Sequence, residues 1–139
     1  MIRIVTESMS DFTQEEAKAA DLIVMPLPIR FGMEEYWDDG VSLTQDDFYA
    51  RLRVAKELPK TSQVPVEHYR KCFNRLLENP EDEVLVITGS SKLSGCYQSA
   101  CIAREACHDP ARVTVLDSLN ATCAEYMLVD QALRYRREG

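Results

Sequence analysis

The sequence lacks the features that would place it in a membrane. No apolar run approaches the length of a membrane span, and the longest candidate, residues 84–87, has the size of a single strand. Residues 1–11 carry acidic and hydroxyl side chains where a secretory signal would need an apolar segment. We therefore expect a cytoplasmic protein that does not insert into a membrane.

Patterns for disulfides, metal sites and nucleic-acid binding are missing as well. The five cysteines include no Cys-x-x-Cys pair, and His68 and His108 are not spaced as partners. An odd number of scattered thiols is typical of reduced cysteines, so we expect no disulfide framework, metal or other cofactor. The net charge is −7, and the only basic cluster, residues 134–137, fits a solvated last helical turn. This charge argues against nucleic acid as a partner.

Short apolar runs alternate with amphipathic segments along the 139 residues. Four runs are expected to form strands: residues 2–5, 22–29, 83–88 and 112–116. Pro26 and Pro28 favour an edge or irregular position for the second run. The order predicts an α/β fold with a parallel sheet flanked by helices on both faces, in one domain of residues 1–139. In such a sheet, ligands bind beyond the carboxyl ends of the strands.

Helix-start signals occur between and after these strands. They are a Thr13–Glu16 capping box, Thr44, Pro65, the segment after Gly95, and Asp117-Ser118. The helix after Thr44 is expected to end by Pro59, and the last helix to run to about Arg136. Residues 31–40 are expected to be a loop, because they contain two glycines and paired aspartates.

The most informative loop is residues 89–95, which joins an expected buried strand to a helix. Unpaired N–H groups at a helix N-terminus stabilise an anion, serine hydroxyls add donors, and Gly95 lets a ligand approach the backbone. The alternative is that Ser94 only caps the helix. Two other hydroxyl-rich segments, residues 6–8 and 61–63, are weak signals individually. Together the three segments predict a donor-lined pocket for a small anion.

Signals for catalysis are weak. A serine nucleophile needs a base within reach, yet His108 lies at an expected helix end and the loop lacks the closing glycine of a nucleophile elbow. The loop also lacks the Gly-Lys-Ser/Thr ending of a P-loop, and Gly40 after Asp38-Asp39 favours a turn over a metal site. We expect a binding protein and not an enzyme. Two alternatives remain: a hydrolase or transferase acting on a small carboxylated or phosphorylated metabolite, and a regulatory module whose anion site has decayed.

Three segments resemble the most specific motifs of the DegV family: residues 61–63 (TSQ), residues 90–100 (SSKLSGCYQSA) and Asp117-Ser118. The likeness extends over essentially the whole chain, which resembles a DegV N-terminal domain. DegV-like proteins bind fatty acids, and some are the carrier subunit of a fatty-acid kinase. The resemblance implies that Thr61 and Ser94 hold the carboxylate of a long-chain fatty acid, with Ser62 and the Gly95 backbone beside them. It also implies a second domain, absent from this chain, that encloses the acyl tail.

The sequence departs from the family pattern at four places. Glu7 stands where aspartate is usual, Cys96 replaces a threonine, and Val64-Pro65 replaces Pro-Ser. Residues 119–125 lack the glycines expected after the aspartate–serine motif. The cysteine and the altered segment 119–125 favour, mildly, the decayed-module alternative.

Overall fold

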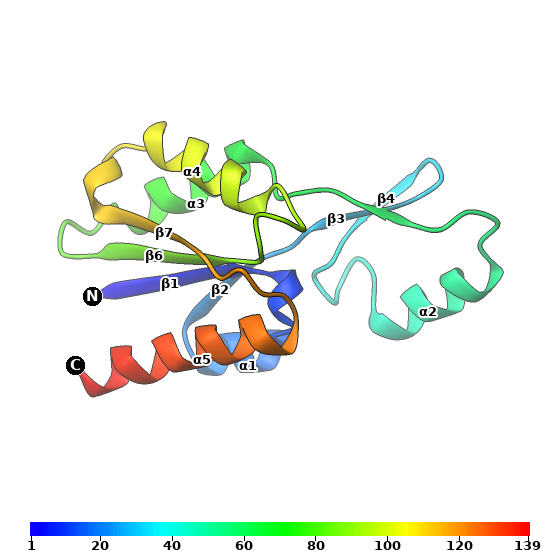
Figure 1. Cartoon of the computed structure of the whole chain (residues 1–139), viewed down its shortest axis with the longest axis horizontal. Helices are drawn as coiled ribbons and strands as arrows, with labels where there is room; N and C mark the ends of the chain where they lie inside the picture. Colours follow the sequence, from blue (N-terminus) through cyan, green and yellow to red (C-terminus); the bar gives the residue numbers. More distant parts are fainter.

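The computed structural model describes residues 1–139, and its centre is a sheet of four parallel strands (Figure 1). Across the sheet the order is β2 (Leu22–Met25), β1 (Ile2–Glu7), β6 (Glu83–Thr88) and β7 (Val113–Asp117). All three neighbouring pairs are parallel, which confirms the predicted α/β fold.

Helices cover both faces of this sheet. The α-helices are α1 (Gln14–Ala19), α2 (Gln45–Val54), α3 (Val66–Leu76), α4 (Cys96–Glu105) and α5 (Cys123–Glu138), and short 3-10 helices span Ser8–Ser10 and Pro110–Arg112. Helices α3 and α4 lie on one face, and α1 and α5 lie on the other (Figure 1). No helix combines the length with the apolar character needed to cross a membrane.

Alternate side chains of the strands enter two separate cores, one on each face. Val84 and Val86 of β6 pack with Phe73 on the face covered by α3 and α4. Ile87, the next residue along, packs with Leu133 on the face covered by α1 and α5. Because both faces are buried, the strand reads as a continuous apolar run in the sequence.

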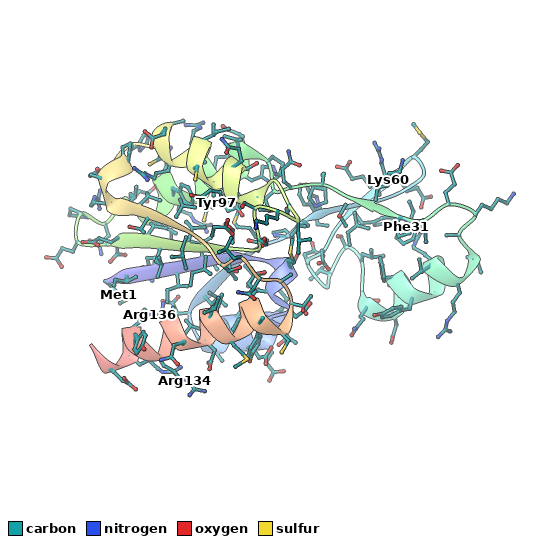
Figure 2. The ribbon with its side chains drawn as sticks, in the orientation of Figure 1. Met1, Phe31, Lys60, Tyr97, Arg134 and Arg136 are labelled. Carbon is teal, nitrogen blue, oxygen red and sulfur yellow. The ribbon has the colours of Figure 1, made fainter.

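A second, antiparallel sheet projects from this body and, with α2, forms the arm (residues 28–61; Figure 1). Its strands are ordered β4 (Glu34–Trp37), β3 (Pro28–Phe31) and β5 (Lys60–Thr61). Figure 2 shows Phe31 and Lys60 on the arm, whereas Tyr97 lies on α4 in the body.

The prediction of a loop at residues 31–40 is wrong, because this segment contains the second strand of a hairpin. Gly32, with a φ of +60°, lies in the turn between β3 and β4. The strand expected over residues 22–29 is likewise two strands, since β2 ends at Met25 and β3 begins at Pro28. The prolines mark this change of sheet: Pro26 lies between the two strands, and Pro28 is the first residue of β3, a strand position that proline tolerates.

Two predicted helix caps are confirmed. The Thr13 hydroxyl accepts the Glu16 N–H at 3.2 Å, and the Glu16 carboxylate accepts the Thr13 N–H at 2.9 Å. The Thr44 hydroxyl accepts the Asp47 N–H at 3.2 Å. These bonds satisfy backbone donors that a helix start otherwise leaves unpaired.

The basic cluster at the end of α5 belongs to the fold. Arg136 donates to the backbone carbonyls of Ala20 and Asp21, which tie the last helix to the end of α1. Arg134 forms an ion pair with Asp130 at 2.8 Å on the exposed side of the same helix. Both arginines lie near the C-terminal end of α5 in Figure 2.

Candidate functional site

Polar segments gather where the parallel strands end. Strands β1, β6 and β7 finish at Glu7, Thr88 and Asp117, so the segments that follow share one edge of the sheet. The loop of residues 89–95 follows the central strand β6 and leads directly into α4. The candidate site is built around this loop.

Ser90 organises the loop from within. Its carbonyl accepts the N–H groups of Leu93 and Ser94 at 2.9 and 3.0 Å, and its hydroxyl accepts the N–H of Lys92 at 3.2 Å. Its own N–H donates to the Asn120 carbonyl at 2.7 Å. Ser90 is 4% exposed, so its role is to shape the turn that presents the residues after it.

Ser94 and Gly95 lie at the start of α4. The N-cap position of α4 is Gly95, which has no side-chain cap, and the Ser94 hydroxyl one residue earlier accepts the Cys96 N–H at 3.2 Å. A hydroxyl that accepts one hydrogen bond still has its own proton to donate. Accepting the Cys96 N–H and donating to an anion are therefore compatible for this hydroxyl.

The arm brings a second donor segment to the same place. Thr61 ends strand β5, and the Ser62 N–H donates to the Pro28 carbonyl at 3.2 Å, so both residues are held by backbone pairing while their side chains stay exposed. Gln63 then packs against Gly95, where an added Cβ would lie 3.2 Å from Gln63 Cδ. The absence of a side chain at Gly95 thus allows the two segments to touch.

These segments surround a cavity of about 160 Å³. Its wall contains all four residues predicted to bind the ligand: Thr61, Ser62, Ser94 and Gly95. The other lining residues are Met9, Leu27, Gln63 and Leu93. Hydroxyl donors beside apolar side chains suit a carboxylate attached to an aliphatic chain. Pockets that enclose a drug-sized ligand measure roughly 300–1,000 Å³, so this cavity fits a head group and not a long acyl chain.

The third hydroxyl-rich segment does not line this cavity, and its predicted place in the pocket is wrong. Thr6 and Glu7 are fully buried at the end of the central strand β1. The Ser8 hydroxyl accepts the Leu27 N–H at 3.1 Å. Strand β1 lies in the middle of the sheet, so its end is covered by the loop of residues 89–95. These buried side chains therefore support the site without lining it.

Asp117 and Ser118 also support the loop, and the prediction that they cap the last helix is wrong. Asp117 Oδ1 accepts the N–H groups of Ser91 and Leu119 at 3.1 and 3.0 Å. Helix α5 begins later, after Thr122, with no side-chain cap. The aspartate therefore anchors the exposed side of the loop to the end of β7.

A pair of buried carboxyls beneath the loop went unnoticed in the sequence. Glu7 and Glu125 are both 0% exposed. Glu7 Oε1 accepts the Gly89 N–H at 2.7 Å, and Glu125 Oε1 accepts the Thr6 hydroxyl at 3.2 Å. Burial raises the pKa of both carboxyls, and burial with the charge of Glu7 raises the pKa of Glu125 to about 9.

A signal for this pair exists in the pattern of α5. Glu125, Val129 and Leu133 recur at a spacing of four, and all three are buried on one face of the helix. An acidic residue in phase with an apolar stripe is expected to be buried with it. Its partner cannot be read from the pattern, because the contact with β1 spans most of the chain.

No general base accompanies Ser94. His68 and His108 both lie outside the cavity wall, and no group of three or more histidine, cysteine or acidic side chains is arranged to hold a metal ion. Cys96 is buried, which raises the pKa of its thiol, and its sulfur accepts the Val64 N–H at 3.4 Å. A neutral, hydrogen-bonded thiol is a structural acceptor, so the site offers binding groups without an activated nucleophile.

Two larger cavities, of about 470 and 450 Å³, involve the arm: the first lies within it, and the second lies between the arm and the body. Neither includes any part of the loop at residues 89–95. The second shares Thr61 but is also lined by Asp11 and Asp38, and burial raises the pKa of Asp38. The acidic wall of the second cavity disfavours an anion. The first cavity contains none of the residues expected to bind a carboxylate, so the smaller cavity is the better candidate.

Comparison with known proteins places the chain among a defined set of relatives. A family model described as "Uncharacterised protein, DegV family" matches residues 1–139. A DegV domain-containing protein of Caldanaerobacter subterraneus subsp. tengcongensis is 39% identical over 138 residues, covering 99% of this chain and 48% of the relative. A protein of Thermotoga maritima named "Fatty acid-binding protein" is 35% identical over 130 residues, covering 88% of this chain and 42% of the relative. The chain thus spans about half the length of these curated relatives.

Solved structures show the same fold. A stearic acid-binding protein from Eubacterium ventriosum has a TM-score of 0.91 at 32% identity, covering 100% of this chain and 48% of that one. A DegV family protein from Thermus thermophilus, described by its fatty acid binding, has a TM-score of 0.88 at 33% identity, covering 99% of this chain and 48% of that one. The whole of this chain therefore corresponds to about half of each of these two proteins.

Proposed function

Because this chain belongs to the DegV family, we propose that it binds the carboxylate of a long-chain fatty acid through the hydroxyls of Thr61 and Ser94. Ser62 and the Gly95 backbone complete the binding surface. The observation that carries the proposal is the meeting of these four residues, from two distant segments, around one small cavity. The relatives described as binding stearic acid or fatty acids support the choice of ligand.

The head group and the tail contribute to binding in different ways. Hydrogen bonds to a charged carboxylate contribute about 1.5–3 kcal/mol each. Burying the tail contributes about 0.8 kcal/mol per CH₂, so a fully enclosed long chain would contribute on the order of 10 kcal/mol. In this proposal the tail leaves the 160 Å³ cavity and is enclosed by a second domain in the half of the relatives that this chain does not cover. Alone, the chain is then expected to bind fatty acid weakly.

The proposed role is that of a binding protein and not an enzyme, since Ser94 has no base beside it. A carrier in the cytoplasm would present the bound carboxylate to the catalytic subunit of a fatty-acid kinase, because an exposed head group is what such a partner would phosphorylate. This carrier role is tested by adding the chain, joined to the second half of a relative, to a fatty-acid kinase and measuring acyl phosphate. Product that depends on Ser94 and Thr61 supports it.

Mass spectrometry of co-purifying lipid tests the binding site. The parent chain is compared with a Thr61→Ala/Ser94→Ala variant and with Thr114→Ala, which removes an exposed hydroxyl on β7 outside the cavity. We expect more co-purifying fatty acid with the parent and with Thr114→Ala than with the double variant.

Calorimetry with laurate covers the case in which a weakly bound lipid is lost during purification. Laurate is short enough to remain in solution and carries the same head group. Equal laurate affinity in the parent and the double variant would show that these hydroxyls do not hold the carboxylate. Absence of binding to every chain would overturn the proposal for this half of the protein.

A further inference from the structure

The buried carboxyls of Glu7 and Glu125 lie directly beneath Gly89, the first residue of the loop. A Cβ added to Gly89 would lie 3.0 Å from Glu7 Oε1 and 3.1 Å from Glu125 Oε2, so the two carboxyls flank one backbone position. Glu7 also accepts the Gly89 N–H at 2.7 Å. The pair therefore touches the first residue of the loop whose far end carries Ser94.

One oxygen of each carboxyl has no donor from the rest of the protein. Glu7 Oε1 and Glu125 Oε1 accept hydrogen bonds, whereas both Oε2 atoms are buried without a partner. The two carboxyls lie beside each other, since one Cβ position at Gly89 is 3.0 Å from Glu7 Oε1 and 3.1 Å from Glu125 Oε2. Two ionised carboxylates have only acceptor oxygens and repel, but one proton held between them satisfies both.

The surroundings of the pair supply no positive charge. Asp11, after the first 3-10 helix, Tyr69 of α3 and Cys96 of α4 are the titratable groups that face it. Burial raises the pKa of Tyr69 and of Cys96, so both are neutral at pH 7, and Asp11 adds only negative charge. No ion pair of the protein includes either glutamate. A shared proton is thus what allows the two carboxyls to coexist.

We propose that Glu7 and Glu125 share a single proton and act as positioning residues, which hold residues 89–95 in the shape that binds an anion. The consequence for the ligand rests on the proposed carboxylate site, but the effect on the loop does not require a ligand. Loss of the proton places a second negative charge beneath Gly89. The carboxyls then repel each other, the loop loses its support, and an anion at Ser94 meets an added repulsion.

An NMR pH titration of the ¹⁵N-labelled chain without ligand tests this directly. Glu125→Gln keeps the shape of the side chain and supplies a donor that cannot ionise. Glu138→Gln, at the exposed end of the same helix, is the matched control. Between pH 6 and 11 the amide signals of residues 89–95 are expected to follow one titration in the parent and in Glu138→Gln, and to stay fixed in Glu125→Gln. The same titration in Glu125→Gln, or loop signals that do not move in the parent, would overturn the proposal.

Laurate affinity at pH 7 and pH 10 gives a readout that general destabilisation would not produce. Laurate itself is ionised at both pH values, so only the protein changes its charge. We expect the parent to lose at least tenfold in affinity at pH 10 and Glu125→Gln to keep its affinity. An equal loss in both chains would contradict the role of the pair. If laurate binds neither chain at pH 7, the proposed function fails, and the amide titration still decides whether the pair positions the loop.

Discussion

The body and the arm form opposite walls of the same cavity, but they are built differently. Ser94 and Gly95 come from the body, where strands and helices share two buried cores. Thr61 is the last residue of the arm, and Ser62 follows it directly. The arm's helix α2 has no buried residue. Several large apolar side chains of the arm are at least 80% exposed: Met33, Val41, Val54 and Leu58.

Because of this difference, the residues that stabilise the fold lie mainly in the body, whereas the binding site needs residues from both regions. The body supplies a wall whose position is fixed by packing, and its loop is held by buried hydrogen bonds. The arm presents its donors on a short antiparallel sheet and leaves apolar surface uncovered, as surfaces that meet another protein element commonly do. We therefore expect mutations in the body to affect folding strongly, and mutations in the arm to affect folding little.

The largest effect is expected from Phe73→Ala, compared with Phe48→Ala. Phe73 is fully buried in the body, whereas Phe48 of the arm is half-buried, with its ring 5.7 Å from that of Phe31. Emptying a buried phenylalanine site costs about 3–5 kcal/mol of unfolding free energy, and we expect about 1 kcal/mol or less in the arm. Denaturant unfolding measures both. Equal losses would show that the arm is as tightly packed as the body.

The pH dependence of stability comes next and tests the carboxyl pair. The pKa of Glu125 is about 9 in the folded chain, against an ordinary value of 4.5 in the unfolded chain. Between pH 4.5 and pH 9 the folded state holds a proton that the unfolded state has lost. The stabilisation that this proton gives the folded state is therefore complete below pH 4.5 and is lost as the pH rises toward 9. The slope for one proton is about 1.4 kcal/mol per pH unit.

Glu125→Gln removes this proton. Relative to the parent, the variant is expected to gain unfolding free energy as the pH rises from 5 to 9, and to level off above that. Thermal or urea unfolding across this range provides the measurement. If the unfolding free energy depends on pH in the same way in both chains, the pair does not hold a proton with a raised pKa.

A glycine in each region sharpens the contrast further. In the body, a Cβ at Gly89 would lie 2.6 Å from Met9 Sδ as well as against both carboxyls, so Gly89→Ala is expected to cost about 1–3 kcal/mol and to abolish laurate binding. In the arm, Gly32 has a φ of +60° and open space around it, so Gly32→Ala is expected to cost about 1 kcal/mol through backbone strain alone. Its laurate binding should persist; loss of binding in Gly32→Ala would tie the hairpin to the site.

The smallest effect is expected at the two threonine caps. Thr13 in the body has a reciprocal capping box with Glu16, and Thr13→Ala is expected to cost about 1 kcal/mol. Thr44 caps α2, which contributes little to the cooperative core, so Thr44→Ala is expected to cost about half as much or less. A reversed order in denaturant unfolding would place α2 within the folding unit of the body.

The sequence was informative where local patterns determine structure. The strand at residues 83–88 and the Thr13–Glu16 capping box depend on neighbouring residues, and both are present as predicted. The hairpin at residues 28–37 was missed because glycines and paired aspartates in residues 31–40 resemble a loop until the strand partner is known. The proximity of Glu7 and Glu125 was missed for the same reason, because these residues are far apart in the sequence. The hydroxyl-rich segments 61–63 and 89–95 were predicted from their residue types to share a pocket, and both line the cavity. The choice of Thr61 and Ser94 within these segments came from the family motif.

The central claim is that Thr61 and Ser94 hold a carboxylate, and ¹³C NMR of laurate labelled at its carboxyl carbon tests it most directly. The label reports on the head group alone, whatever happens to the tail. On adding the parent chain, we expect the carboxyl signal to shift and to saturate, and we expect no such shift with the Thr61→Ala/Ser94→Ala variant. A signal that shifts equally with both chains would place the carboxylate elsewhere and contradict the account.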